Sequence, residues 1–344
     1  MSTKSSNLRK RFVAISGLLL LGVAIAGLWV SAIAAHAESG QAFSISPPLV
    51  DLKANPGDTT AATIKITNIS AGDLLIKTEF NDFGAKDETG DPNIIFNPDQ
   101  DTPHSLRHWI ASPDPFMLAS KQTKTITFPI NVPKDAEPGG HYAVIRFTGT
   151  TPELEQSGVA LSASIGSLVL LNISGDVKES ATLADLYTGT PKLAKQSFFE
   201  FGPIAFVERI NNDGNVHIKP TGTVQIFNAF GQKVGEVRVN GDPTDIKNMP
   251  KNVLPKSIRR FDQTWDPGWA LGNFTAKLHV VYGDSGKSLD TSIGFWVIPY
   301  KLILLIAAAG VGLFFAIKYG LKRYNDYIIA KASSGKLKKL RIKK

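Results

Sequence analysis

Apolar and polar residues alternate with a period of two in several short runs, and no long amphipathic helix is visible between residues 38 and 296. Such alternation places one face of a strand on a core and the other in water. The apolar positions of three runs are Ala62, Ile64 and Ile66; Ile126, Phe128, Ile130 and Val132; and Ala276, Leu278, Val280 and Tyr282. The pattern predicts half-buried β-strands.

One run, Leu168-Val169-Leu170-Leu171, is apolar on both faces, which is typical of a central strand covered on both sides. Turn-forming residues separate the runs, among them Asn55-Pro56-Gly57-Asp58 and Pro138-Gly139-Gly140. Several short strands at this spacing indicate a β-sandwich.

The stretch from residue 38 to residue 296 is too long for one small sandwich, and a weak internal repeat divides it. Residues 64–80 resemble residues 207–227, since each has a strand ending in Asn, a turn containing Gly, and a second strand. Residues 138–147 resemble residues 271–281 in the same way. We therefore predict an all-β chain with two tandem immunoglobulin-like sandwiches, residues 38–176 and 177–296.

Two apolar segments flank this stretch. Residues 12–35 follow a basic N-terminus and lead to Ala35-His36-Ala37, so residues 1–37 are predicted to be a helical secretory signal peptide. Because the apolar stretch is longer than a usual signal core, an uncleaved signal anchor is the alternative. Residues 297–317 reach the ~20 residues that a transmembrane helix needs, and residues 318–344 form a tail.

Side chains at the ends of the second apolar segment support a membrane span. Trp296, Tyr300 and Tyr319 lie at its two boundaries, and Lys301 is close enough to one end to extend its ammonium to the interface. The tail is basic, and its last cationic residues would lie against anionic lipid. These are Lys336, Lys338, Lys339, Arg341, Lys343 and Lys344. The positive-inside rule predicts a single-pass type I protein of the cell membrane with the bulk of the chain outside.

The net charge of +8 belongs to the two ends of the chain, because the part between them is acidic. A nucleic-acid-binding domain would need basic residues on a folded face, so nucleic acid is not an expected partner. The chain contains no Cys, which excludes disulfides, thiolate zinc sites, iron–sulfur clusters and Cys nucleophiles.

No catalytic motif is apparent in the sequence. His104 and His108 have helical metal-ligand spacing but no third ligand nearby, and a solvated surface position is expected for His279. Asn97, Asp99 and Asp101 alternate like a calcium loop without its Gly and Glu, so we interpret them as part of a long acidic loop. We expect a non-enzyme without metal or cofactor.

Exposed aromatic side chains are the remaining ligand candidates, because sugars and protein partners both contact them. Trp265 and Trp269 flank an Asp-Pro-Gly turn, and we expect at least one of them in the core, with Trp269 exposed. Trp269 and Trp109, beside the acidic loop, are the candidate ligand-binding residues. The sequence Phe198-Phe199-Glu200-Phe201 is predicted to be a buried strand rather than part of a domain interface.

The first predicted domain resembles the peptidoglycan-binding domain of WxL-interacting proteins of Gram-positive-type bacteria. The matching stretches are residues 43–53, Pro56-Gly57-Asp58, residues 62–68, residues 118–133, and the Gly139-Gly140 hairpin into residues 142–147. The order of signal, two sandwiches, membrane helix and basic tail is also similar. The resemblance implies a surface protein that holds cell-wall polymer and presents its second domain to a protein, but the matching positions are fold-forming ones.

We therefore predict a membrane-anchored cell-surface binding protein whose first domain contacts peptidoglycan or another cell-wall glycan and whose second domain contacts a surface protein. The alternative is a membrane-tethered chaperone or scaffold for surface protein assembly that captures a partner's strand along an exposed sheet edge. An unpaired apolar edge strand would favour the alternative, and a groove of aromatic and polar groups would favour a glycan ligand.

Overall fold

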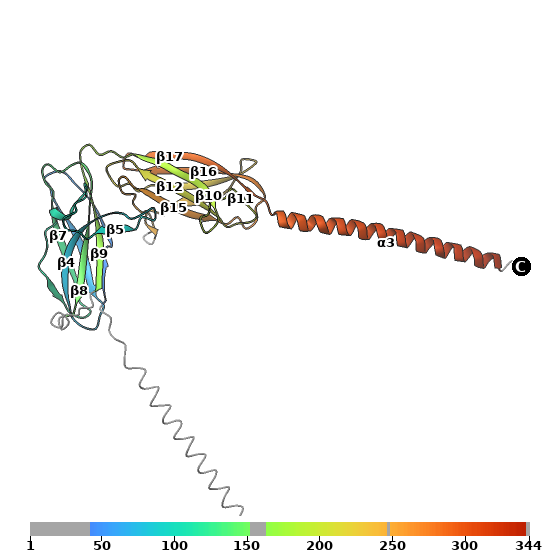
Figure 1. The fold of residues 1–344 in the computed structure, drawn as a ribbon, viewed down its shortest axis with the longest axis horizontal. Coiled ribbons are helices and arrows are strands. Elements are labelled where there is room, and N and C mark those ends of the chain that lie inside the picture. Colours follow the sequence, from blue (N-terminus) through green and yellow to red (C-terminus); the bar gives the residue numbers. More distant parts are fainter. Residues whose placement is uncertain (1–41, 152–162, 246–247, 342–344) are drawn as a thin grey trace, which may run out of the picture.

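The computed structural model describes residues 42–151, 163–245 and 248–341, so the predicted signal helix of residues 1–37 lies outside the described residues. Two β-sandwiches and a C-terminal helix make up the described chain, which confirms the predicted all-β class (Figure 1). The first sandwich, domain 1, contains β1–β9, and the second, domain 2, contains β10–β17. Domain 1 stands upright in Figure 1, domain 2 extends sideways from its upper end, and the helix continues from the far end of domain 2.

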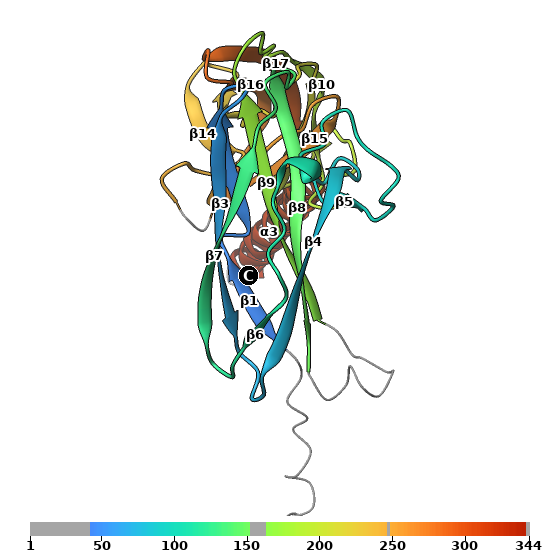
Figure 2. The same cartoon turned by 90° about the vertical axis from the view of Figure 1, so that its left-hand side faces the viewer.

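Domain 1 packs two sheets face to face. One sheet has the order β1-β3-β7, and the other has the order β2-β9-β8-β4-β5, with β6 also pairing with β4 (Figure 2). The elements are β1 (Phe43–Ser46), β2 (Leu49–Ala54), β3 (Thr59–Asn68), β4 (Leu74–Ala85), β5 (Pro92–Ile95), the short helix η2 (Arg107–Trp109), β6 (Phe116–Leu118), β7 (Thr123–Asn131), β8 (Gly139–Thr150) and β9 (Ala163–Ile173).

Domain 2 repeats this plan with sheets of the orders β10-β12-β15 and β11-β17-β16-β13-β14. Its strands are β10 (Ala181–Gly189), β11 (Phe198–Phe199), β12 (Ile204–Asn212), β13 (Thr221–Asn228), β14 (Lys233–Val239), β15 (Ile258–Trp265), β16 (Gly272–Tyr282) and β17 (Lys287–Val297). The helix α3 (Tyr300–Arg341) follows at once.

The alternating runs form the two cores, as predicted. Ile64 and Phe128 are buried between the sheets of domain 1, and Leu278 and Val280 are buried in domain 2. His279, between the last two, is exposed as expected and donates from its ring to the Asp290 carboxylate at 2.6 Å. The period of the pattern therefore fixes which face of each strand is covered.

The internal repeat has a structural basis in two buried asparagines, Asn68 at the end of β3 and Asn212 at the end of β12. Each accepts a hydrogen bond from the backbone N–H two residues later, at 2.9 Å in both domains. Each side-chain amide also donates to the carbonyl four residues later and to a carbonyl far along the chain, Leu118 or Val253. We call this arrangement the asparagine latch. Because every polar atom of the side chain is paired, its burial is not penalised.

The C-terminal helix is long and apolar enough to span a membrane over Tyr300–Lys331, by length and composition. It begins three residues after the start of the predicted span, because Val297 is the last residue of β17 and packs in the core of domain 2. Among the predicted anchor residues, Trp296, Tyr300 and Tyr319 are exposed around the helix, and Lys301 forms an ion pair with Glu200 at 2.6 Å.

The predicted buried strand at Phe198–Phe201 is wrong in part. Phe199 is buried in the core of domain 2, whereas Phe198 and Phe201 are exposed. The reason is that β11 has only two residues, whose side chains point to opposite faces of the sheet, so that only Phe199 reaches the core.

Candidate functional site

The first part of β9 forms an open sheet edge. On one side β9 pairs with β8 along its whole length, from Ala163 to Ile173. On the other side β2 pairs with it only from Leu168 onwards. No strand in the described part of the chain pairs with Ala163–Ser167 on that side, and we call these five residues the open edge.

The open edge offers both backbone groups and an apolar side chain. The N–H of Leu168 donates toward the β2 side, to the carbonyl of Pro48 at 3.0 Å. Because alternate residues of a strand face the same side, the N–H and C=O groups of Ser164 and Gly166 face the unpaired side. Ile165 faces the same side of the sheet as the buried Val169, yet its side chain is 37% exposed. An added strand could therefore gain hydrogen bonds and cover Ile165 together.

A cleft of about 600 Å³ lies between the two domains, next to the end of the open edge. Pro47 and Pro48 line this cleft, and Ser167 donates from its hydroxyl to the carbonyl of Pro47 at 2.9 Å. The walls are mainly apolar. They include Leu49, Phe83, Leu168 and Leu170 of domain 1 with Met249 and Leu254 of domain 2. A segment that leaves the open edge at Pro47 would meet this cleft.

Two buried polar atoms in the cleft have no hydrogen-bond partner among the described residues: Nε of Arg259 and Oδ1 of Asn252. Arg259 donates through one guanidinium nitrogen to the carbonyl of Asn252 at 2.7 Å. The guanidinium group of Arg259 lies against Gly90. Burial lowers the pKa of Arg259, and the charge of Asp91 opposes that shift. An unpaired donor and acceptor in an apolar cleft are groups that a bound backbone segment could satisfy.

Charged contacts hold the domains in this arrangement. Asp51 on β2 accepts from Lys219 at 2.6 Å and contacts His217 at 3.2 Å, both in domain 2. Burial raises the pKa of Asp51, but the hydrogen bonds and charges of His217 and Lys219 outweigh this effect and lower the pKa to about 2. Tyr142, whose pKa is raised by burial, contacts the other side of the His217 ring.

Backbone contacts and further ion pairs, among them Lys53 with Asp284, add to the interface. Gly140 donates from its N–H to the carbonyl of Asn215 at 2.8 Å, and the side chain of Asn215 donates to Pro138 at 3.1 Å. Arg209 forms a two-pronged ion pair with Glu88 of the β4–β5 loop. The cleft is thus formed between domains that are joined at several points.

Trp109 occupies a separate, polar hollow of about 330 Å³ in domain 1. It is partly buried, and its ring lies 4.5 Å from that of His141, which also lines the hollow. The remaining lining is largely acidic or small, with Asp101, Asp135 and Glu137 among it. Here a predicted ligand-binding residue lies in a concavity together with polar groups.

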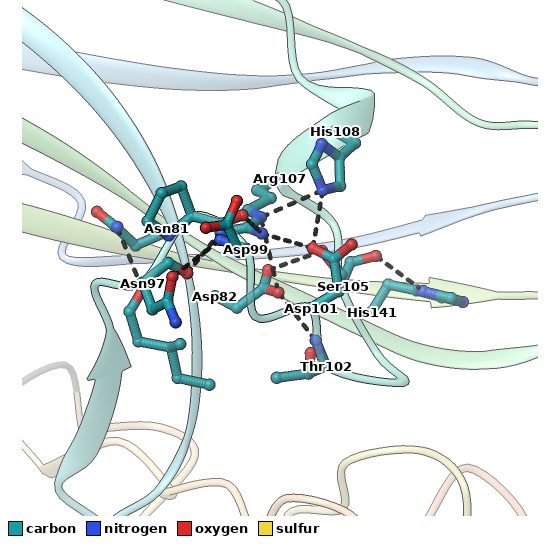
Figure 3. A network of polar contacts seen from close by, with 12 residues as sticks. Asn81, Asp82, Asn97, Asp99, Asp101, Thr102, Ser105, Arg107, His108 and His141 are labelled. Atoms are coloured by element: carbon teal, nitrogen blue, oxygen red, sulfur yellow. Dashed lines mark hydrogen bonds and ion pairs between the residues drawn. The ribbon is translucent and has the colours of Figure 1, made fainter.

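The acidic loop beside this hollow is organised around Arg107 (Figure 3). The Arg107 guanidinium donates to Asp101 and to the carbonyl of Pro98, each at 2.6 Å, and lies 3.9 Å from the buried Asp82. His108 contacts the same Asp101 oxygen at 2.8 Å. The hydrogen bonds and charges of His108 and Arg107 lower the pKa of Asp101. A side-chain cation therefore occupies the centre of the acidic loop.

In the described residues, no group of three or more His, Asp or Glu side chains is arranged to hold a metal ion. His104 and His108 do not act as a pair, because His108 turns to Asp101 while His104 packs against the rings of His141 and Tyr142. Burial lowers the pKa of His104.

The two candidate tryptophans do not form one site. Trp109 lies in domain 1, whereas Trp269 lies at the end of domain 2 near the helix and is 63% exposed. The expectation for the Trp265–Trp269 pair is confirmed, since Trp265 is buried in the core of domain 2. The helix backbone includes Lys336, Lys338, Lys339 and Arg341, while Lys343 and Lys344 lie outside the described residues.

Sequence reasoning missed the open edge and the cleft. The open edge exists because β2 pairs with β9 only from Leu168 onwards. The sequence of β9 alone does not show where this pairing ends. One signal was available for the cleft: the double-faced apolar run at Leu168–Leu171, whose outward residues Leu168 and Leu170 belong to the same apolar cluster as Leu254 of domain 2.

No protein-family model matches the sequence, and no curated protein matches it either. Solved structures with a similar fold include the class 5 fimbriae chaperone CfaA, at 14% identity over 75% of this chain and 100% of that chain, with a TM-score of 0.37. The CupB2 chaperone of Pseudomonas aeruginosa matches at 12% identity over 74% and 100%, with a TM-score of 0.32. The CsuC–CsuE chaperone–tip adhesion subunit complex of Acinetobacter baumannii matches at 11% identity over 73% and 98%, with a TM-score of 0.33. The likeness is one of fold.

Proposed function

We propose that this chain is a membrane-anchored, non-enzymatic scaffold that captures an extended segment of a surface protein as an added strand on the open edge of β9. The observation that carries the proposal is the unpaired stretch Ala163–Ser167, with an apolar side chain, Ile165, exposed on its core-facing side. Strand addition uses backbone hydrogen bonds for affinity and side-chain pockets for selectivity.

The cleft extends this binding site. A captured strand that runs along the open edge reaches Pro47 and Pro48, and the continuing segment enters the apolar space between the domains. There it would meet the unpaired atoms of Arg259 and Asn252. The apolar helix α3 would hold this site at the cell membrane, with domains 1 and 2 outside.

Photo-crosslinking from the open edge tests the proposal. A photoreactive amino acid replaces Ser164 in the full chain, and Ser292, exposed on β17 of domain 2, serves as the matched control position. We expect position 164 to crosslink to an extended, alternately apolar segment of a surface protein, identified by mass spectrometry. Equal crosslinking from positions 164 and 292 would exclude selective capture.

A backbone variant separates strand addition from simple contact. Ser164→Pro removes an N–H that faces the unpaired side, so the ladder with β8 keeps all its hydrogen bonds. We expect this variant to lose the captured segment, whereas Ser164→Ala retains it. Retention by both variants would mean that the contact does not use the backbone of β9.

Contact of domain 1 with cell-wall polymer, and membership of the WxL-interacting family, remain predictions from the resemblance. The hollow around Trp109 and His141 is the place where an aromatic ring lies beside polar groups, which is the feature expected of a glycan site. Saturable co-sedimentation of the full chain with protein-free cell-wall sacculi, lost in Trp109→Ala, would support it. No binding above that of an unrelated acidic sandwich would reject it.

A further inference from the structure

Exposed large apolar side chains of domain 2 gather at the end from which α3 leaves. The exposed large apolar side chains in the described strands and loops of domain 2 lie on four segments at that end, with the exceptions of Met249 in the cleft and Val234 on β14. Together they form what we call the basal face: Phe198, Phe201, Phe230, Trp269, Leu271 and Trp296. Phe230 is 88% exposed at the tip of the β13–β14 turn, and Trp269 is 63% exposed.

Strand register places these four segments side by side. Gly272, which follows Leu271, pairs with Val297 at the end of β17, and Phe198 pairs with Trp296. Asn228, which opens the β13–β14 turn, pairs with Phe274 on the neighbouring β16. The turn carrying Phe230, the approach to β16 carrying Leu271, and the start of α3 are therefore at one end of the sandwich (Figure 1).

Contacts between the loops hold the basal face together. The Phe198 ring lies 6.4 Å from the ring of Tyr300, the first residue of α3. A Cβ on Gly202 would lie 2.7 Å from Pro267, so the loop carrying Phe201 packs directly on the turn before Trp269. The aromatic residues are thus part of a built surface that is continuous with the helix.

The charges at this end do not oppose a membrane contact. Glu200 pairs with Lys301 at 2.6 Å, and Asp266 accepts from the N–H of Gly268 at 3.0 Å. Lys233, beside the β13–β14 turn, pairs with Glu236. Two further lysines, Lys192 and Lys195, lie exposed in the loop that leads to β11, and Lys195 also pairs with Asp185 at 3.2 Å. Acids that have hydrogen-bond or ion-pair partners, together with exposed lysines, are compatible with lipid headgroups.

We infer that the basal face is a membrane-docking surface that inserts its aromatic and aliphatic side chains into the headgroup region around the entry point of α3. The inference rests on the proposed membrane anchoring through α3. Trp, Phe and Leu are side chains that favour this interfacial region, and the helix start fixes the basal face at its level. Trp269 is then a lipid contact rather than a glycan contact. Docking of domain 2 would hold the open edge of domain 1 at a fixed position above the membrane.

Single-cysteine labelling tests the inference cleanly, because the chain contains no native Cys. The full chain is reconstituted in nanodiscs of phosphatidylcholine and phosphatidylglycerol with a spin label at Leu271→Cys or Phe230→Cys. The matched control is Ser292→Cys, which is exposed on the same outer face of β17 as Trp296 and lies about 13 Å further from the helix. Ala308→Cys, within α3, reports whether the helix spans the bilayer.

We expect labels at positions 271 and 230 to be more accessible to oxygen than to a water-soluble nickel complex, and the label at position 292 to show the reverse. Water exposure at 271 and 230 with lipid exposure at 308 would overturn docking and leave the anchor intact. Water exposure of the label at position 308 as well would overturn both the docking of the basal face and the membrane anchoring through α3. Spin–spin coupling between copies at 271, without lipid exposure, would assign the basal face to a second copy of the chain instead.

A measurement without added labels guards against effects of the substitution. Brominated lipids quench tryptophan emission from the interfacial region, so the unsubstituted chain is compared with Trp269→Phe in the same nanodiscs. We expect the quenched fraction to fall in the variant. An unchanged quenched fraction would show that Trp269 does not contact lipid and would overturn its place in the docking surface.

Discussion

Glu208 gives the sharpest stability prediction, because it is a carboxyl group in the core of domain 2. It lies on the inward face of β12 between Phe206 and Ile210, and it is fully buried. The Gln263 side-chain amide lies 2.7 Å from its carboxyl. Burial, aided by the charge of Asp262, raises the pKa of Glu208 against the opposing effect of its hydrogen bonds, to about 8. At neutral pH the folded protein therefore keeps this group protonated.

The direction of the pH effect follows from this raised pKa. Between the unfolded pKa of about 4.5 and the folded pKa of about 8, the folded chain holds a proton that the unfolded chain has released. The stabilisation is complete below about pH 4.5 and is lost as the pH rises through about 8. A shift of this size corresponds to roughly 5 kcal/mol as an upper bound, at about 1.4 kcal/mol for each pH unit.

Glu208→Gln tests this reasoning, since the amide has the same shape and carries no titratable proton. The free energy of unfolding of the full chain is measured with urea in detergent micelles from about pH 5 to about pH 8. We expect the variant to match the unsubstituted chain at the acid end and to exceed its stability by several kcal/mol at the alkaline end. Glu236→Gln, on the exposed strand β14, is the control. Parallel pH curves for Glu208→Gln and the unsubstituted chain would refute a buried, protonated Glu208.

Two further predictions concern the contact between the domains. Asp51→Asn should lower the free energy of unfolding by about 1–2 kcal/mol, because His217 and Lys219 lower the pKa of Asp51 in the folded protein. This stabilisation is present above about pH 4 and is lost as the pH falls toward 2. Acid unfolding curves that coincide for the variant and the unsubstituted chain would contradict this. Gly139→Ala should destabilise by about 1–3 kcal/mol, because its φ is +122° and a Cβ would lie 2.6 Å from the carbonyl of Asn215. Thermal unfolding checks it, with Gly72→Ala, where a Cβ meets open space, expected to stay within about 0.5 kcal/mol.

The strands were predictable from the sequence because burial acts on alternate residues, as at Ile64 and Leu278. The repeat at Asn68 and Asn212 was also visible, since the same local hydrogen bonds need the same residue type in both domains. In contrast, the open edge depends on where β2 stops pairing with β9. That point is set by tertiary register, and a pattern of apolar residues does not report it.

The functional surfaces were predictable only in fragments. The exposure of Trp269 was expected, but its neighbours on the basal face come from loops far apart in the sequence, such as those carrying Phe201 and Phe230. The expected buried strand at Phe198–Phe201 was correct only for Phe199, because the sequence does not show that the strand ends there. The acidic loop was recognised, while the role of Arg107 at its centre was missed, because an arginine in a sequence carries no sign of which carboxylates it will reach.

The asparagine latch has a consequence for how the chain reaches its folded state. In each domain it connects the end of one strand to a carbonyl group that is distant in the sequence, from Asn68 to Leu118 and from Asn212 to Val253. Many small exported domains close loops of this length with a disulfide, which needs an oxidant to form and is broken by reductants. Here hydrogen bonds make the connection, so folding needs no oxidation step. The native structure should therefore be insensitive to reductants that break disulfides.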